Sequence, residues 1–172
     1  MIHLPECKLK VWNIIENCCH FIVYRLLRIK LSDSTWNTLI QFVKFGIVGL
    51  SNTLIGYAIY VVALKILRFG QLFPKIDIYL AQFVMFVLSV LWSFYWNNKA
   101  VFKKKEGEER NIFHALMKTY ASYAFTSLFL SEVLLLLWVR VFHISEYIAP
   151  ILNLLITVPL NFIIQKLWAF KS

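Results

Sequence analysis

Four long apolar stretches dominate the chain, at residues 45–64, 78–96, 119–139 and 147–165. Three of them contain no charged residue, and the third along the chain contains one, Glu132. A helix needs about 20 apolar residues to cross a hydrocarbon core roughly 30 Å thick. Backbone groups that meet no water there must bond to one another within a helix. The pattern therefore predicts an all-α integral membrane protein with four transmembrane helices.

The N-terminal segment has a different periodicity. Apolar residues recur there at steps of three or four, at Leu9, Trp12, Ile15, Cys19, Ile22, Leu26 and Ile29. This spacing predicts an amphipathic helix that ends at Ser32-Asp33-Ser34. Its basic residues suit the anionic cytoplasmic leaflet, so the helix is expected in the membrane interface; packing on the bundle or on a partner is an open alternative. We expect a cytoplasmic amphipathic helix over residues 1–38 and a four-helix transmembrane domain over residues 39–172.

Composition and charge support this topology. The chain is 60% hydrophobic and 16% charged, which is more apolar than a soluble domain of 172 residues can hide. Its net charge of +9 could indicate nucleic acid, but all except four of the 18 Lys and Arg lie before span one, between spans two and three, or after span four. Because basic loops stay on the cytoplasmic side, both termini are expected in the cytoplasm. No nucleic-acid partner is expected.

The sequence carries no sign of an enzyme or of a metal site. It has no phosphate loop, no dinucleotide fingerprint and no paired carboxylates, so we expect no catalytic residue and no cofactor. Cys7, Cys18 and Cys19 all lie in the cytoplasmic segment. Their odd number and the reducing compartment favour small buried free thiols over disulfides or metal ligands.

The chain repeats itself after spans two and four, at residues 93–103 and 161–171. A gap-free alignment pairs Phe94 with Phe162, Asn97 with Gln165, Phe102 with Phe170, and Lys103 with Lys171. Lys44 and Lys118 open spans one and three in the same way. Because two spans return the chain to its starting side, this pattern predicts two parallel hairpin repeats. Transporters are built from such repeats, with the pathway at the interface between them.

Polar residues within the spans are candidates for function. A charged group in the bilayer is costly, and the helical neighbours of Glu132 are apolar. Either a partner comes from another helix, or the carboxyl group stays protonated. Asn153 reaches a similar depth, and the two are expected to form a polar pair. Asn52 lies beside Gly49 and Gly56, which favour close helix packing. Each of these groups could line a pathway or only join helices.

A second set of candidates gathers at the cytoplasmic boundary. Aromatic anchors and snorkelling lysines explain the residue types there. Amides and ammonium groups at headgroup depth also suit an anionic phospholipid or a polyprenyl phosphate. The candidate substrate-binding residues are Lys44, Asn52, Asn97, Asn98, Lys99, Lys118, Glu132, Asn153, Asn161 and Lys166.

Residues 40–171 resemble the GtrA-like family of four-helix membrane proteins. The likeness rests on Phe-Val-Lys-Phe-Gly-Ile-Val-Gly-Leu-Ser-Asn-Thr at 42–53 and on the motifs at 93–102 and 161–170. Gln165 and Ala169 depart from the asparagine and valine that are usual in the family. The resemblance implies a flippase of the bacterial plasma membrane. Such a protein moves a sugar on polyprenyl (undecaprenyl) phosphate from the inner to the outer leaflet, for O-antigen, teichoic acid or another surface polysaccharide.

The resemblance implies two partners, the polyprenyl-phosphate glycolipid and a membrane glycosyltransferase, in addition to membrane lipids. A homodimer is also expected, because four helices are few to enclose a glycolipid headgroup. One alternative function is a non-transporting anchor or regulatory subunit of a polyprenyl-phosphate glycosyltransferase. Another is a small proton-coupled multidrug-type exporter, which is disfavoured because the first span lacks a carboxylate.

Overall fold

The computed structural model describes residues 7–103, 109–145 and 147–171, and these contain helices and no strand. Four helical segments are long and apolar enough to cross a membrane: Asp33–Phe69, Asp77–Val101, Ile112–Val141 and Ala149–Ala169. The predicted all-α class with four spans is therefore confirmed. The first six residues of the predicted N-terminal helix, and most of the linker after the second span, lie outside the described residues.

The α-helices are α1 (Cys7–His20), α2 (Asp33–Phe69), α3 (Asp77–Trp96), α4 (Ile112–Ala124), α5 (Ser131–Leu136) and α6 (Ala149–Ile164). Short π-helices extend them: η1 (Phe21–Leu26), η2 (Asn97–Val101), η3 (Phe125–Leu130), η4 (Leu137–Val141) and η5 (Gln165–Ala169). Ser32 caps α2, because its Oγ accepts a hydrogen bond from the backbone N–H of Thr35 at 3.3 Å. The first span and the residues that precede it, from Asp33 onward, thus form one continuous helix.

The chain divides into two compact units, residues 1–44 and residues 45–172. In the first unit, α1 and η1 pack on the beginning of α2. The rings of His20, Tyr24 and Trp36 form a cluster with centroids 4.5 to 5.7 Å apart. Glu16 forms an ion pair with Lys44. These contacts favour the alternative in which the N-terminal helix packs on another helix.

Cys18 and Cys19 do not share one buried face. Cys18 is exposed and Cys19 is half-buried, so the prediction of buried thiols was wrong for Cys18. The reason is that adjacent residues on a helix point in different directions. Burial raises the pKa of the Cys19 thiol, and the neighbouring Cys18 and Glu16 raise it further. Cys19 is therefore the less reactive thiol of the pair.

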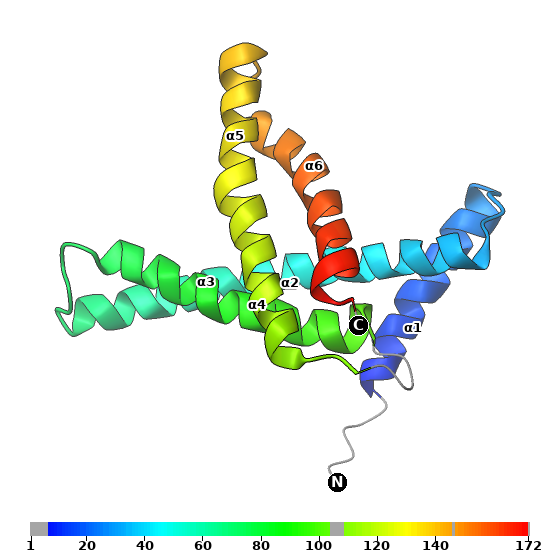
Figure 1. Ribbon diagram of the computed structural model, residues 1–172, viewed down its shortest axis with the longest axis horizontal. Coiled ribbons are helices and arrows are strands. Elements are labelled where there is room, and N and C mark those ends of the chain that lie inside the picture. Colours follow the sequence, from blue (N-terminus) through cyan, green and yellow to red (C-terminus); the bar gives the residue numbers. More distant parts are fainter. Residues whose placement is uncertain (1–6, 104–108, 146, 172) are drawn as a thin grey trace, which may run out of the picture. The chain divides into compact units, whose positions relative to one another are not determined.

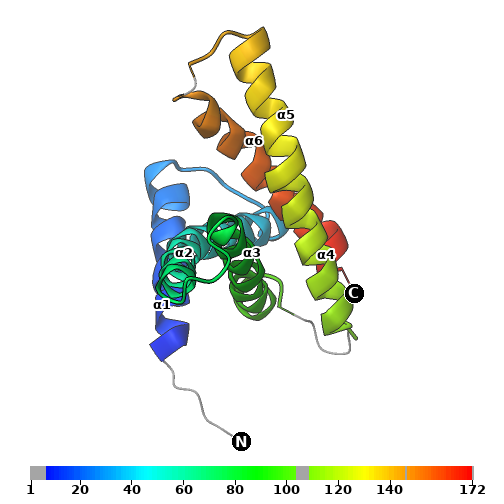
Figure 2. The same ribbon diagram turned by 90° about the vertical axis from the view of Figure 1, so that its left-hand side faces the viewer.

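The second unit contains two helical hairpins. Figures 1 and 2 show α2 beside α3, and α5 beside α6. In the first hairpin, Trp92 Nε1 donates to Ser51 Oγ at 3.3 Å. A Cβ added at Gly56 would lie 3.5 Å from the Cβ of Ser89, whereas one added at Gly49 would meet nothing within 4 Å. The predicted small-residue contact is thus made at Gly56.

The repeat seen in the sequence is also present in the backbone. Asn97 and Gln165, which are 68 residues apart, each begin a five-residue π-helix at the end of a span. Phe102 N–H bonds to the Asn97 carbonyl at 2.7 Å, and Phe170 N–H bonds to the Gln165 carbonyl at 2.8 Å. The same spacing of 68 residues separates Ala81, near the start of α3, from Ala149, at the start of α6. Both alanines are fully buried. Each hairpin is therefore one copy of the repeat.

Candidate functional site

The two hairpins meet through equivalent residues at the ends of α3 and α6. Asn97 Nδ2 donates to Gln165 Oε1 at 3.2 Å, and both side chains are fully buried. The phenylalanines pair in the same manner: Phe102 with Phe170 at 4.8 Å between centroids, Phe94 with Phe170 at 5.6 Å, and Phe162 with Phe102 at 5.7 Å. If each of these residues is replaced by its counterpart 68 positions away, the same pairs of residues result. The hairpins are thus related by an approximate twofold axis that passes between Asn97 and Gln165.

Further hydrogen bonds extend this contact into what we call the inter-repeat network, composed of Ser93, Asn97, Ser122, Tyr123, Asn161 and Gln165. The bonds are Asn97 Nδ2 to Ser93 Oγ (3.3 Å), Ser93 Oγ with Tyr123 Oη (2.7 Å), Ser122 Oγ to Asn161 Oδ1 (2.7 Å) and Gln165 Nε2 to Asn161 Oδ1 (3.4 Å). Buried polar groups are stable only when paired, so the network holds the hairpins in register. Among the described residues Asn97 Oδ1 is buried without a partner.

Cations surround the same end of the second unit. We call Lys99, Arg110, Lys118 and Lys166 the cation rim. Each cation lies over an aromatic ring, at distances to the centroid of 5.2 Å (Lys99 on Tyr95), 5.4 Å (Arg110 on Phe170), 5.7 Å (Lys118 on Trp168) and 5.7 Å (Lys166 on Phe162). Two of these rings belong to the phenylalanine pairs between the hairpins. The rim and the inter-repeat network therefore form one site.

Arg110 belongs to this site, although sequence reasoning missed it. Its Nη1 donates to Asn98 Oδ1 at 3.0 Å and to the Phe102 carbonyl at 2.9 Å. In the sequence it ends a run of charged residues that is typical of a solvated linker. Only the fold brings it back onto the end of α3, so no local signal could have identified it. Asn98, a predicted candidate, thus lies at the site as the acceptor for Arg110.

Lys44 belongs to the first unit. Its ammonium group is paired with the Glu16 carboxylate and lies 5.8 Å from the Trp12 ring centroid, and its side chain is 11% exposed. Its equivalent in the second hairpin, Lys118, instead donates to the Trp168 carbonyl at 3.3 Å. The two lysines therefore differ in partner, although each opens the first span of its hairpin.

The predicted pair of Glu132 and Asn153 does not form. Asn153 Nδ2 instead donates to the carbonyl and the Oγ of Ser131, at 2.8 and 3.2 Å. Ser131 faces α6, and the next residue on a helix points about 100° away. Glu132 is exposed, and no hydrogen bond or ion pair joins it to another described residue. Asn52 is half-buried, and its Oδ1 has no partner among the described residues.

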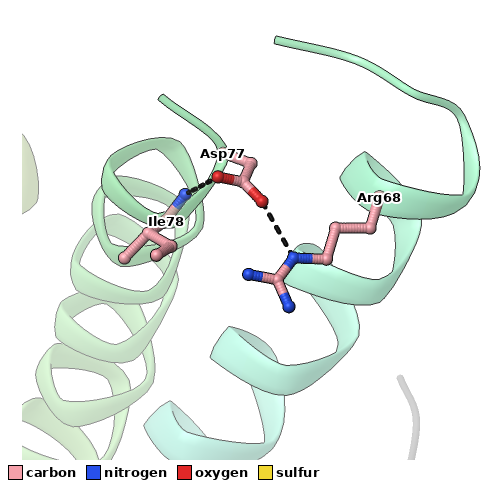
Figure 3. A network of polar contacts seen from close by, with 3 residues as sticks. All are labelled: Arg68, Asp77 and Ile78. Carbon is pink, nitrogen blue, oxygen red and sulfur yellow. Dashed lines mark hydrogen bonds and ion pairs between the residues drawn. The ribbon is translucent and has the colours of Figure 1, made fainter. Parts of the chain in front are cut away.

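Cavities lie at the opposite end of the hairpins from the network. One of about 290 Å³ adjoins the α2–α3 turn, where it is lined in part by Arg68 and Asp77. Figure 3 shows that the carboxylate of Asp77 accepts from Arg68 Nε and from the Ile78 N–H, both at 2.9 Å. Arg68 is therefore neutralised by an ion pair. A larger cavity of about 720 Å³ lies between η4 and the start of α6.

The comparison with protein families decides the assignment. The model of the family described as GtrA/DPMS, transmembrane domain, matches residues 44–170. The chain belongs to this family. The GtrA/DPMS domain thus covers the four spans, the inter-repeat network and the cation rim, and the resemblance expected from the sequence is confirmed. No curated protein and no solved structure matches the chain.

Within this GtrA/DPMS domain, the ten predicted candidates separate into groups. Five residues gather at the network end: Asn97 and Asn161 inside the network, and Lys99, Lys118 and Lys166 in the rim. Asn98 joins them through Arg110. Lys44 pairs with Glu16 within the first unit, and Asn153 bonds to Ser131. No side-chain hydrogen bond joins Asn52 or Glu132 to another described residue. In the described part of the chain, no three His, Cys, Asp or Glu side chains are grouped closely enough to hold a metal ion.

Proposed function

We propose that this GtrA/DPMS domain moves a polyprenyl phosphate-linked sugar across the bacterial plasma membrane, from the inner to the outer leaflet. In this proposal both termini and the network end face the cytoplasm, in keeping with the distribution of Lys and Arg along the sequence. The observation that carries the proposal is the cation rim beside the contact between two parallel repeats. Transporters built from repeats bind their substrate where the repeats meet.

The rim has the chemistry that a phosphate headgroup requires. Ammonium and guanidinium groups form short, strong hydrogen bonds with phosphate oxygens. The aromatic rings beneath them supply an apolar surface for the prenyl chain. We propose that Lys99, Lys118 and Lys166 take up the phosphate in the cytoplasmic leaflet.

After the rim has bound the phosphate, the inter-repeat network would take part in the next step. Loading would separate Asn97 from Gln165 and expose their amides, which can then bond to sugar hydroxyls in place of one another. The described cavities lie at the far end of the hairpins, while the network end is closed by paired side chains. The paired side chains at the network end support a conformation in which the loading side is closed, as alternating access requires of one of its states.

The proposal also includes a second copy of this chain, in a homodimer. Glu132 is exposed in the middle of a span and its side chain makes no hydrogen bond or ion pair with another described residue, and an isolated carboxyl group in the bilayer is costly. We propose that this face of α5 lies at a homodimer contact, where a second protomer or the sugar provides the missing hydrogen bond.

The test is translocation of a fluorescent polyprenyl-phosphate sugar by the purified full-length protein in liposomes. Lys118→Gln and Lys166→Gln together are expected to slow transfer at least tenfold. The matched control is Lys65→Gln, because Lys65 is an exposed lysine at the opposite end of the first span. Wild-type protein that moves no lipid, yet retains a polyprenyl-phosphate glycosyltransferase in a pull-down, would contradict transport and support the anchoring alternative.

A further inference from the structure

The cavity at the α5–α6 turn, which we call the α5–α6 cavity, carries unused basic groups. Its volume is about 720 Å³, within the usual range for small-molecule sites. It is lined by Leu135, Leu136, Val139, Arg140, His143 and Pro150. A second cavity of about 370 Å³ adjoins it and shares Val139 and His143. The lining thus combines two basic side chains with an apolar wall.

The first hairpin provides an internal comparison for Arg140. Arg68 lies in the last turn of α2, and Arg140 lies in the last turn of η4. Arg68 is neutralised by Asp77, the first residue of α3, whereas the first residue of α6 is Ala149, which carries no charge. Within the described residues, Arg140 makes no hydrogen bond and no ion pair. The second hairpin therefore keeps a positive charge that the first one neutralises.

Nearby carboxylates do not change this conclusion. Glu132 lies eight residues before Arg140, or about 12 Å along the helix, which is beyond the reach of an ion pair. Glu146 lies outside the described residues. Its influence on Arg140 is therefore tested directly below.

His143 occupies a backbone position that favours glycine. Its φ is 54°, in the left-handed region, and it ends the helix with a bond from the Ile144 N–H to the Trp138 carbonyl at 2.9 Å. Gln71 has the same conformation after α2, with a φ of 52° and a bond from the Leu72 N–H to the Leu67 carbonyl at 2.8 Å, so this backbone marks a helix end in both hairpins. The helix end thus places the His143 side chain at the wall of the cavity, in a backbone conformation that glycine also adopts.

We infer that the α5–α6 cavity binds the phosphate headgroup of a polyprenyl phosphate lipid on the side of the membrane where the sugar is released. Arg140 and His143 donate hydrogen bonds to the phosphate oxygens, and Leu135, Leu136 and Val139 contact the first prenyl units. The inference rests on the proposed function, to which it adds a separate site at the exit. The phosphate would thereby be held in the outer leaflet while a glycosyltransferase removes the sugar.

The test counts lipids bound to the full-length protein in nanodiscs of neutral phosphatidylcholine, by native mass spectrometry with farnesyl phosphate as the probe. Wild-type protein is expected to bind two molecules per chain, one at the cation rim and one in the α5–α6 cavity. Arg140→Gln and His143→Gly should each reduce the number to one. His143→Gly should leave the melting temperature unchanged or raise it, because it relieves the left-handed strain.

The control is Arg68→Gln, which removes an equivalent arginine at the same end of the other hairpin and should leave two molecules bound. Farnesol should not bind, since it lacks the phosphate. Inorganic phosphate that competes as well as farnesyl phosphate would overturn the inference in favour of a free-anion site. So would binding that begins only after Glu146→Gln, because Arg140 would then be neutralised in the native chain.

The two proposals fail in different ways. Two bound molecules in both wild type and Arg140→Gln would overturn the exit site and leave transport standing. One molecule in wild type and none in Arg140→Gln would support the exit site and contradict capture at the rim.

Discussion

The strongest structural prediction concerns the hydrogen bond between Asn97 and Gln165. Asn97→Leu keeps a branched side chain of similar size but removes the donor to Gln165 Oε1, which then stays buried without a partner. Gln165 Nε2 retains its bond to Asn161, so one acceptor is orphaned. Leaving a buried acceptor unpaired costs about 1–3 kcal/mol. Hydrogen bonds between helices in membranes contribute about 0.6 kcal/mol on average and about 1.7 kcal/mol at most. A loss of about 1–2 kcal/mol is therefore expected.

The assay is a double-mutant cycle of Asn97→Leu and Gln165→Leu, measured by reversible unfolding in mixed micelles. Because the double variant leaves neither amide of the pair orphaned, it should be less destabilised than the sum of the single variants, by about 0.5–1.5 kcal/mol. Thr53→Val is the control, since the Thr53 hydroxyl is exposed and bonds only to the Gly49 carbonyl of its own helix. Additive effects, within about 0.3 kcal/mol, would refute the direct contact between equivalent residues.

Three further predictions concern packing and reactivity. Glu16→Gln removes the ion pair that ties the N-terminal helix to α2, so limited proteolysis near residues 27–32 should become several-fold faster; an unchanged rate would contradict this role. In single-cysteine variants, Cys18 should react with a maleimide several-fold faster than Cys19 at pH 7.5, because the raised pKa of Cys19 reduces its thiolate fraction, and the difference should narrow at higher pH. Gly56→Ala should be tolerated, since its Cβ would make ordinary contacts, whereas Gly56→Leu should destabilise by about 1–3 kcal/mol. Equal melting temperatures for the two variants would show that α2 and α3 do not pack closely there.

The four spans and the repeat could be predicted from the sequence because they depend on local patterns. Apolar length decides a span, and the gap-free match of residues 93–103 with 161–171 identified the repeat. The partner of each polar residue could not be predicted, because it depends on helix rotation. Asn153 and Glu132 were placed at similar depth, but one residue of rotation gives the contact to Ser131 instead.

The partners of the amide side chains at the cytoplasmic boundary could not be predicted from the sequence either. Asn97 and Asn161 were expected to line a headgroup site, and the twofold arrangement buries them against their own counterparts and neighbours. Sequence alone identified residue types that suit a phosphate. Only the fold shows that Lys99, Lys118 and Lys166 remain at the edge while the amides close the interface between the repeats.

The most direct measurement of the proposed mechanism combines a cross-link with transport. Phe102→Cys and Phe170→Cys, in a chain whose native cysteines are replaced by serine, place two thiols where equivalent rings stack 4.8 Å apart. A bis-methanethiosulfonate reagent that joins the two thiols should lock the hairpins together and stop glycolipid translocation in liposomes, and reduction should restore it. Translocation at the same rate in the cross-linked and reduced proteins, with cross-linking shown to be complete, would contradict the claim that the repeats must separate.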